Sequence, residues 1–343
     1  MRAMTSTAPK PLKPLVDRYD RTITYLRLSV TDRCDLRCNY CMAERMTFLP
    51  KRDLLSLEEL ERLADAFIAR GVRKIRITGG EPLVRRDIMS LLRQLGRHLN
   101  SGALDELTIT TNGTTLARYA DDLMDIGVRR VNISLDTLDR VTFAKVTRRD
   151  ALNDVLAGID SAQRAGLSVK VNTVALKDVN QYEIPSMIEW AHRRNIALTL
   201  IEVMPLGDVS EDRFDQYLPL TKIKDGLKRR WRLSPLPLTT GGPAQYARIE
   251  ETGGVVGFIT PLTNNFCANC NRVRVTCTGQ IYMCLGHADR IDLRSALRGQ
   301  NSEAALQLAL DRAMMQKAKR HAFEIEKPNA SPSLERHMSV TGG

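Results

Sequence analysis

The sequence predicts an α/β protein: an incomplete (β/α)6 barrel of the TIM type, followed by a C-terminal extension. Six β-branched, apolar runs alternate with amphipathic segments, which is the pattern of parallel strands joined by helical crossovers. The repeat length of these units is that of a barrel, and a doubly wound open sheet is the second choice. Either fold places its site at the carboxyl ends of the strands.

The elements follow in order along the chain. Strands are predicted at residues 22–30, 73–78, 106–111, 129–134, 167–175 and 197–203. Helices are predicted between them at residues 56–71, 88–99, 116–127, 152–166 and 184–195. The first helix has the clearest boundaries, because Ser56 is a good N-cap, Glu59 completes a capping box and Gly71 ends the helix.

The remaining segments set the predicted domain limits. Further helices are expected at 218–231, near 292–299 and at 302–319, whereas residues 329–343 look too small and polar to form a packed element. We divide the chain into a flexible arm (1–21), a partial barrel (22–240) and a C-terminal domain (241–343).

No apolar run approaches the roughly 20 residues that cross a bilayer, and the first residues lack the apolar core of a signal peptide. We therefore expect a cytoplasmic protein without membrane contact.

The charge balance is basic. Lys and Arg number 51 against 40 Asp and Glu, a net charge of +11. A solvated surface, nucleic-acid binding or a polyphosphate ligand would each explain it. Because aromatic residues make up only 5% of the chain, a stacking platform for single-stranded nucleic acid is not expected.

The seven cysteines form two tight groups. They are Cys34, Cys38 and Cys41, then Cys267, Cys270, Cys277 and Cys284. A disulfide scaffold is not expected in a chain of this length without an export signal. Clustered cysteines in a reducing compartment indicate a metal site instead.

The first group, TDRCDLRCNYC, directly follows the first predicted strand. Three thiolates can hold three corners of a cubane iron–sulfur cluster, which leaves one iron without a protein ligand. That vacancy is similar to the open position of catalytic zinc sites. Zinc itself is the alternative, but it needs a fourth ligand, and the nearest histidine is His98.

The second group, FCANCNRVRVTCTGQIYMCL, repeats this arrangement. Cys267, Cys270 and Cys284 again supply three ligands. Cys277 lies between them, so a four-cysteine zinc knuckle is the alternative.

The spacing C-x3-C-x2-C, with an aromatic residue before the last cysteine, resembles the radical S-adenosylmethionine superfamily. Gly79-Gly80-Glu81-Pro82, after the second predicted strand, resembles its glycine motif. The resemblance implies a 4Fe–4S cluster whose open iron is chelated by S-adenosylmethionine, which is cleaved to a 5′-deoxyadenosyl radical. We expect the glycines to let backbone carbonyls approach the cofactor amine.

Nearly the whole chain resembles the GTP 3′,8-cyclase family, which begins molybdenum cofactor synthesis. The similar blocks are YLRLSVTDRC, KIRITGGEPLVRRD, TTNG, VNISLDTL, VTRRD, AGLSVKVNTV, IEVMP, CNRVR and the terminal Gly-Gly. The resemblance implies a second 4Fe–4S cluster on Cys267, Cys270 and Cys284 that binds guanine, with Cys277 a packed bystander. The implied reaction converts GTP to (8S)-3′,8-cyclo-7,8-dihydroguanosine 5′-triphosphate.

The same resemblance implies the site residues. Contacts to S-adenosylmethionine are expected from Tyr40, Gly79, Gly80, Glu81, Ser134 and Met204. Contacts to GTP are expected from Arg27, Lys74, Arg76, Thr110, Lys170, Arg272, Val273 and Arg274. The catalytic set is Arg27, Arg272, Arg274, Gly342 and Gly343, the last two on a tail that reaches into the site. A basic set is physically reasonable, because a triphosphate carries about four negative charges and this chain has no Walker loop to hold it.

Three positions depart from the family pattern: Asp35 replaces Asn, Ala43 replaces Pro and Thr199 replaces Arg.

The expected partners are GTP, a downstream cyclic pyranopterin monophosphate synthase, an electron donor such as flavodoxin or ferredoxin, and a second copy of the chain. No nucleic-acid partner is expected. The alternatives are another radical S-adenosylmethionine enzyme with an auxiliary cluster, such as a peptide-modifying maturase, or a zinc-binding nucleic-acid-binding protein.

Overall fold

A single curved sheet organises the molecule. The computed structural model describes residues 12–207, 213–238, 240–263, 267–321, 323, 334 and 336–342. Twelve strands follow the order β12-β11-β10-β1-β2-β3-β4-β5-β6-β9-β8-β7. The eight strands from β10 to β9 in this order are parallel, and an antiparallel pair extends the sheet at each side.

The strands are short, as expected for a barrel wall. They are β1 (Tyr25–Ser29), β2 (Lys74–Thr78), β3 (Glu106–Thr111), β4 (Arg130–Ser134), β5 (Ser168–Ala175), β6 (Ala197–Glu202), β7 (Leu233–Leu236), β8 (Gln245–Ile249), β9 (Val255–Ile259), β10 (Arg272–Val275), β11 (Gln280–Tyr282) and β12 (Arg290–Asp292).

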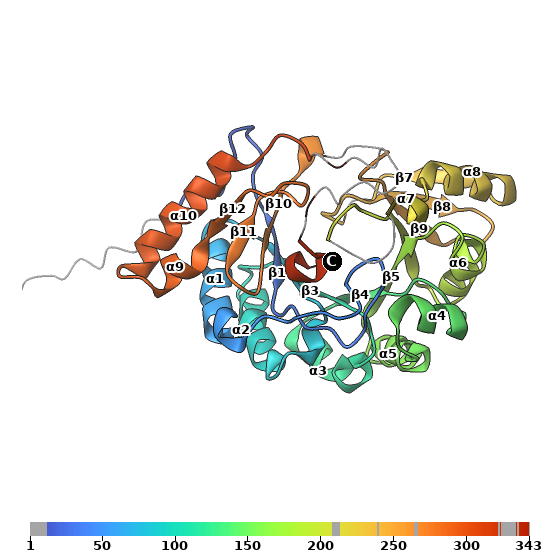
Figure 1. Cartoon of the computed structure of the whole chain (residues 1–343), viewed down its shortest axis with the longest axis horizontal. Coiled ribbons are helices and arrows are strands. Elements are labelled where there is room, and N and C mark those ends of the chain that lie inside the picture. Colours follow the sequence, from blue (N-terminus) through green and yellow to red (C-terminus); the bar gives the residue numbers. More distant parts are fainter. Residues whose placement is uncertain are drawn as a thin grey trace, which may run out of the picture.

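Most of the helices lie outside the sheet, and Figure 1 shows them around its convex face. They are α1 (Leu57–Ala69), α2 (Ile88–Asn100), α3 (Ala120–Ile126), α4 (Arg140–Thr147), α5 (Leu152–Arg164), α6 (Ile184–Arg193), α7 (Arg213–Gln216), α8 (Leu220–Arg230), α9 (Leu293–Arg298), α10 (Ser302–Gln316) and the single turn α11 (Met338–Thr341). The predicted capping box is confirmed: Ser56 Oγ accepts from the Glu59 amide, and Glu59 Oε2 accepts from the Ser56 amide. The predicted partial barrel is confirmed as well.

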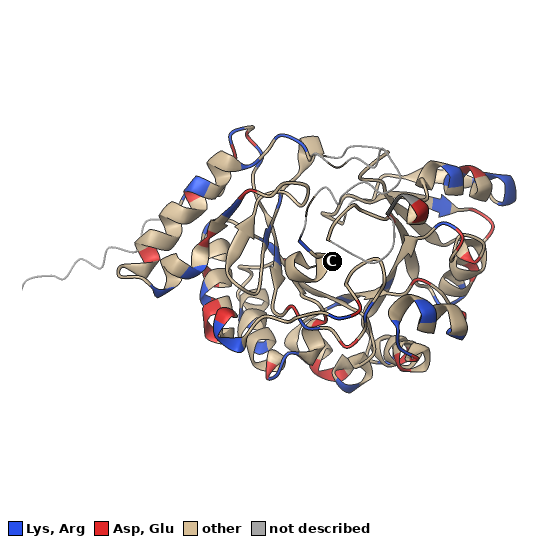
Figure 2. Ribbon diagram, in the orientation of Figure 1, with Lys and Arg blue, Asp and Glu red and all other residues tan. Residues whose placement is uncertain are grey.

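Alternation along each strand separates the core from the barrel interior. In β1 and β2, the fully buried Leu26, Leu28, Ile75 and Ile77 belong to the hydrophobic core, whereas Arg27 and Arg76 have the opposite parity and line an interior pocket. Other charged residues of both signs lie on the outer helices (Figure 2). Along these strands, residues that face the barrel interior therefore alternate with residues of the hydrophobic core.

Two predictions about the chain ends differ from the structure where it describes them; residues 1–11, 329–333, 335 and 343 lie outside the described residues. Residues 12–21 are not a free arm, because Leu15 is fully buried and its amide donates to the carbonyl of Arg70 at 3.0 Å. Residues 338–341 are packed, since α11 lies inside the curve of the sheet (Figure 1) with Ser339 2% and Thr341 0% exposed. Small side chains such as those of Ser339 and Thr341 fit this enclosed position. The predicted limits at 240 and 241 stay a prediction.

Within the described residues, no helix is both long enough and apolar enough to span a bilayer.

Candidate active site

Two pockets open inside the barrel. The N-terminal pocket is lined by the first cysteine triplet and the C-terminal pocket by the second. Asn172, Ile201 and Met204 line both. The two pockets are therefore neighbouring compartments with a common wall from β5, β6 and the loop after β6.

The N-terminal pocket collects residues from the ends of β1, β2, β3, β4 and β6. The predicted residues that line it are Cys34, Cys38, Cys41, Tyr40, Gly79, Gly80, Thr110, Ser134 and Met204. Thr110, a predicted GTP contact, lines this pocket and not the C-terminal one, and its contact with GTP stays a prediction. The strand pattern predicts which face of the sheet carries Thr110. The curvature of the barrel determines which of the two pockets that part of the face lines.

Gly79 and Gly80 bring the backbone of the loop after β2 against the first cysteine loop. The Gly80 amide donates to the Thr31 carbonyl at 2.8 Å. A Cβ atom on Gly80 would collide with the Arg33 carbonyl oxygen. These glycines thus allow two backbones to approach each other closely, and the cysteine loop is held by that contact.

Glu81 does not line either pocket. Its fully buried carboxylate accepts from the Leu83 amide at 2.9 Å, from Thr111 Oγ1 at 2.8 Å and from the Asn112 amide at 2.6 Å. Burial raises the pKa of Glu81 to about 7. Through these bonds Glu81 joins the loop after β2 to the end of β3, and its predicted contact with the cofactor stays a prediction.

Two polar residues of this pocket, Asp136 and Asn112, are not in the predicted contact set. Tyr40 donates its hydroxyl to Asp136 at 2.6 Å, and burial raises the pKa of Asp136 to about 6. Asn112 Nδ2 lies 3.7 Å from Cys34 Sγ and donates to Asp35 at 2.7 Å. Their place at strand carboxyl ends, within the TTNG and VNISLDTL blocks, was the available signal.

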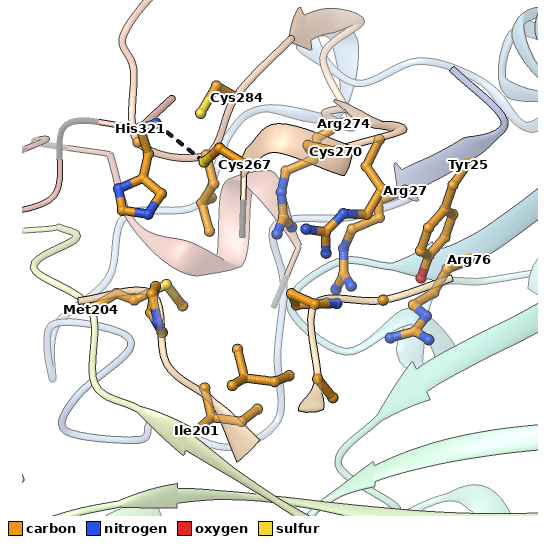
Figure 3. Close-up of a pocket in the computed structure, with 18 of the residues that line it drawn as sticks. Tyr25, Arg27, Arg76, Ile201, Met204, Cys267, Cys270, Arg274, Cys284 and His321 are labelled. Carbon is orange, nitrogen blue, oxygen red and sulfur yellow. Dashed lines mark hydrogen bonds between the residues drawn. The ribbon is translucent and has the colours of Figure 1, made fainter. Parts of the chain in front are cut away.

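The C-terminal pocket has a strongly basic wall. Strand register places Arg27 opposite both Arg274 of β10 and Arg76 of β2. Figure 3 shows the three side chains together on one side of the pocket, with Met204 and Ile201 across from them. Like charges in such positions repel, and no Asp or Glu is among the described residues that line this pocket. The wall is built for an anion.

The basic groups are largely desolvated. Burial, together with the nearby Arg76, lowers the pKa of Lys170 to about 7. Burial also lowers the pKa of Arg27 to about 10, and that of Arg274 falls for the same reason. Arg27 Nε and Arg76 Nε are buried without a hydrogen-bond partner among the described residues. Buried polar atoms are normally paired, so these atoms fit a ligand that supplies acceptors.

Most predicted GTP contacts lie in this pocket. They are Arg27, Arg76, Lys170, Arg272, Val273 and Arg274. Lys74 is not among the lining residues; its Nζ donates to the Thr240 carbonyl at 2.6 Å and pairs with Glu106 at 2.5 Å. Tyr246 was missed, although its hydroxyl accepts from Lys170 Nζ at 2.6 Å. Thr199 lines neither pocket and lies fully buried beside Asn172 in the sheet.

Cys267, Cys270 and Cys284 also line the C-terminal pocket, and Cys277 does not. Cys277 is fully buried elsewhere, and burial raises the pKa of its thiol to about 12. The His321 amide donates to Cys267 Sγ at 3.4 Å (Figure 3).

The cysteine geometry fits clusters better than single ions. In the part of the chain that the structure describes, no three His, Cys, Asp or Glu side chains converge tightly enough to hold one metal ion. Each triplet instead borders an open pocket. A cubane suits this arrangement, because each thiolate binds a different iron.

The C-terminal tail touches both compartments. Met338 and Ser339 line the N-terminal pocket, and Arg274 Nη1 donates to the Gly342 carbonyl at 2.5 Å. Gly342 has φ +76°, and a Cβ atom there would overlap Thr78 Oγ1. Gly343 lies outside the described residues.

Comparison with known proteins decides the family. Residues 28–191 match the radical SAM superfamily, and residues 196–323 match the Molybdenum Cofactor Synthesis C family. A GTP 3′,8-cyclase of Rhodopseudomonas palustris is 60% identical over 99% of this chain and 100% of its own length. The chain belongs to the GTP 3′,8-cyclase family. A member from Brucella ovis is 59% identical over 97% of each chain.

Solved structures of lower identity show the fold alone. Streptococcus suis SuiB bound to S-adenosylmethionine has a TM-score of 0.59 and 15% identity, covering 87% of this chain and 69% of SuiB. Native anSMEcpe with bound AdoMet has a TM-score of 0.57 and 14% identity, covering 83% of each chain.

Membership in the GTP 3′,8-cyclase family confirms the predicted family, fold class and enzyme class. It also makes S-adenosylmethionine and two 4Fe–4S clusters the cofactors of the family. The alternatives of a peptide-modifying maturase and of a zinc-binding nucleic-acid-binding protein gain no support from it.

Proposed function

We propose that this chain converts GTP to (8S)-3′,8-cyclo-7,8-dihydroguanosine 5′-triphosphate, the first step of molybdenum cofactor biosynthesis. In this proposal Cys34, Cys38 and Cys41 hold the cluster that binds S-adenosylmethionine. Cys267, Cys270 and Cys284 hold the cluster that binds the guanine base. The register of Arg274, Arg27 and Arg76 across three adjacent strands carries the proposal, because a triphosphate is the ligand that such a row of buried cations suits.

When bound, the first cluster and S-adenosylmethionine supply the 5′-deoxyadenosyl radical that removes H3′ of the ribose. The chain's own residues bind and orient. Arg27, Arg76 and Arg274 neutralise the triphosphate, and the shared wall of Asn172, Ile201 and Met204 keeps the nucleoside beside the cofactor. Such positioning replaces an encounter in solution by a prearranged one.

The tail completes the compartment in this proposal. The Gly342 carbonyl fixes the Arg274 guanidinium through their hydrogen bond. Met338 and Ser339 cover the N-terminal pocket from the side of the tail. Both contacts exclude water from the place where the radical is transferred.

The test is an anaerobic assay of the reduced protein with S-adenosylmethionine and each nucleoside triphosphate in turn. We expect 5′-deoxyadenosine only with GTP, deuterium transfer only from GTP labelled at C3′, and about eight irons per chain. The proposal would be overturned if 5′-deoxyadenosine formed equally with every nucleoside triphosphate. Colourless protein with stoichiometric zinc would also overturn it.

The remaining partners belong to the same proposal. The cyclised product requires a consuming enzyme, the cyclic pyranopterin monophosphate synthase, and cluster reduction requires flavodoxin or ferredoxin. The cysteines of both triplets form no disulfides within the described structure, which suits the reducing cytoplasm. A homodimer is proposed without a specific interface, and its test is the mass of the anaerobic holoprotein in solution.

A further inference from the structure

Lys317 is a buried ammonium beside the second cysteine triplet. It caps the C-terminal end of α10 and is only 1% exposed. Its Nζ donates to the Met283 carbonyl at 2.6 Å and to the Arg272 carbonyl at 3.1 Å, and it lies 3.8 Å from Cys270 Sγ. The side chain thus reaches from the end of a helix into the base of the C-terminal pocket.

A buried lysine normally has a carboxylate partner, because an uncompensated charge is costly away from water. None of the salt bridges among the described residues involves Lys317. Its contacts are two neutral carbonyls and one thiol. Among the described residues, the group placed to balance Lys317 is the Cys270 thiolate together with whatever that thiolate binds.

Two other cations reach the same triplet from distant parts of the chain. Arg21 Nη1 donates to the Cys267 carbonyl at 2.8 Å. Arg336 donates to the carbonyls of Leu285 and His287, in the loop after Cys284. Each cysteine segment of the second triplet therefore has one cation of its own.

The first triplet has a different surrounding. Asp35 and Cys34 are both within reach of Asn112 Nδ2, at 2.7 and 3.7 Å. Asp136 lies in the pocket wall beside Cys38 and Cys41. Arg37 is a cation at this loop, where it donates to the Cys34 carbonyl, but no buried lysine approaches a thiol here among the described hydrogen bonds.

We infer that Lys317 is the counter-ion of the second iron–sulfur cluster and raises its reduction potential. The inference rests on the proposed function, in which Cys267, Cys270 and Cys284 hold that cluster. With three thiolates the oxidised 4Fe–4S cluster carries one net negative charge, and the reduced cluster carries two. A fixed buried cation stabilises the more negative form more strongly, so the electron is accepted more readily at this site.

The experiment measures the potential of the second cluster by itself. In the full chain, Cys34, Cys38 and Cys41 are each replaced by Ser, so that only the second cluster is assembled. Anaerobic redox titration followed by electron paramagnetic resonance then compares three single variants: Lys317→Gln, Lys317→Arg and Lys319→Gln. Gln is neutral and one bond shorter than Lys, Arg keeps the charge, and Lys319 is an exposed residue near Lys317.

In Lys317→Gln we expect the ratio of oxidised to reduced cluster to rise at least tenfold at a fixed potential, a downward shift of about 59 mV for one electron. Lys319→Gln should leave the potential unchanged, and Lys317→Arg should keep it close to the parent value. An unshifted potential in Lys317→Gln with the cluster bound would overturn the inference. An equal downward shift in Lys317→Arg would also overturn it, since charge would then not be the cause.

A second measurement covers the case in which Lys317→Gln fails to hold its cluster. The melting temperature of each variant is compared between iron-free and reconstituted protein, and the gain on reconstitution should be smaller in Lys317→Gln than in Lys319→Gln. Equal gains would reject the counter-ion role. If the parent protein binds no iron at the second triplet, the proposed function itself fails, and this outcome is distinguished by iron content alone.

Discussion

At the scale of single residues, the sheet contains neighbouring cations that lower the stability of the ligand-free fold. Arg27 has an arginine on either side of it in the sheet. Like charges at such positions destabilise a sheet. Stability given up at one place in this way is typical of a functional site.

Lys170 provides a pH-dependent prediction. Its pKa is lowered to about 7 by burial and by nearby cations. Between pH 7 and the ordinary lysine pKa the unfolded chain therefore binds more protons, so this group makes the ligand-free fold more stable as pH rises. An anionic ligand prefers the protonated form, and we expect GTP binding to the holoprotein to weaken about tenfold per pH unit between pH 7 and 9.

Calorimetry of GTP binding at several pH values checks this expectation. Lys170→Met should bind more weakly at pH 6 and lose most of the dependence. Because the phosphates of GTP titrate equally with both proteins, the difference between the two slopes isolates Lys170. Parallel slopes would show that Lys170 is not the titrating group.

Gly342 provides a second prediction at this scale. Its φ of +76° and its contact with Thr78 exclude a side chain. We expect Gly342→Ala to lower GTP cyclisation at least tenfold while both clusters remain, as measured by product formation and iron content. Gly102→Ala is the matched control, because Gly102 has a similar φ of +73° with nothing near the position of a Cβ atom. Equal activity of the two variants would contradict a role for the fit of the tail.

At the scale of elements, the loop after β2 positions the first cysteine loop. A methyl group on Gly80 would meet the Arg33 carbonyl, and backbone atoms cannot move aside as a flexible side chain can. We expect Gly80→Ala to lose the first cluster and keep the second, which leaves about four irons per chain. Iron analysis and electron paramagnetic resonance check this, and the second cluster is the internal control. Eight irons and full activity would mean that the loop adapts.

Part of the site could be predicted from the sequence, and part could not. Alternation and helix caps predict that Cys34, Gly80 and Ser134 meet at one edge of a parallel sheet, and they line one pocket. The role of Glu81 could not be predicted, since no pattern tells whether a carboxylate is already occupied by backbone amides. Thr110 lines the N-terminal pocket, a placement that strand parity could not predict because parity does not determine how the sheet curves; its contact with GTP stays a prediction.

Pairings between distant segments were equally hidden. Nothing local in residues 272–275 indicates that they pair with β1, although this pairing builds the arginine row. Residues 338–341 have no amphipathic pattern, and they are packed because of what surrounds them.

At the scale of the whole molecule, the tail contacts several separate parts of the fold. Leu334 bridges to Leu206 after β6, Arg336 holds the loop after Cys284, and Gly342 reaches Arg274 of β10.

We expect Arg336→Met to release this segment, because two carbonyls lose their donor. Carboxypeptidase digestion should become faster and cyclisation slower, with the second cluster retained. Arg290→Met, at an exposed site on β12, is the control. Unchanged digestion would contradict the role of Arg336.

The position of β1 in the sheet has a consequence for synthesis of the protein. β1 is made early, yet its neighbour β10 leaves the ribosome only after most of the chain. Until then one side of a buried, apolar strand exposes unpaired amides and carbonyls, a condition that favours association with other chains. A fragment that stops at residue 240 would keep that open side permanently. We therefore expect it to aggregate rather than persist as a folded barrel with one cluster.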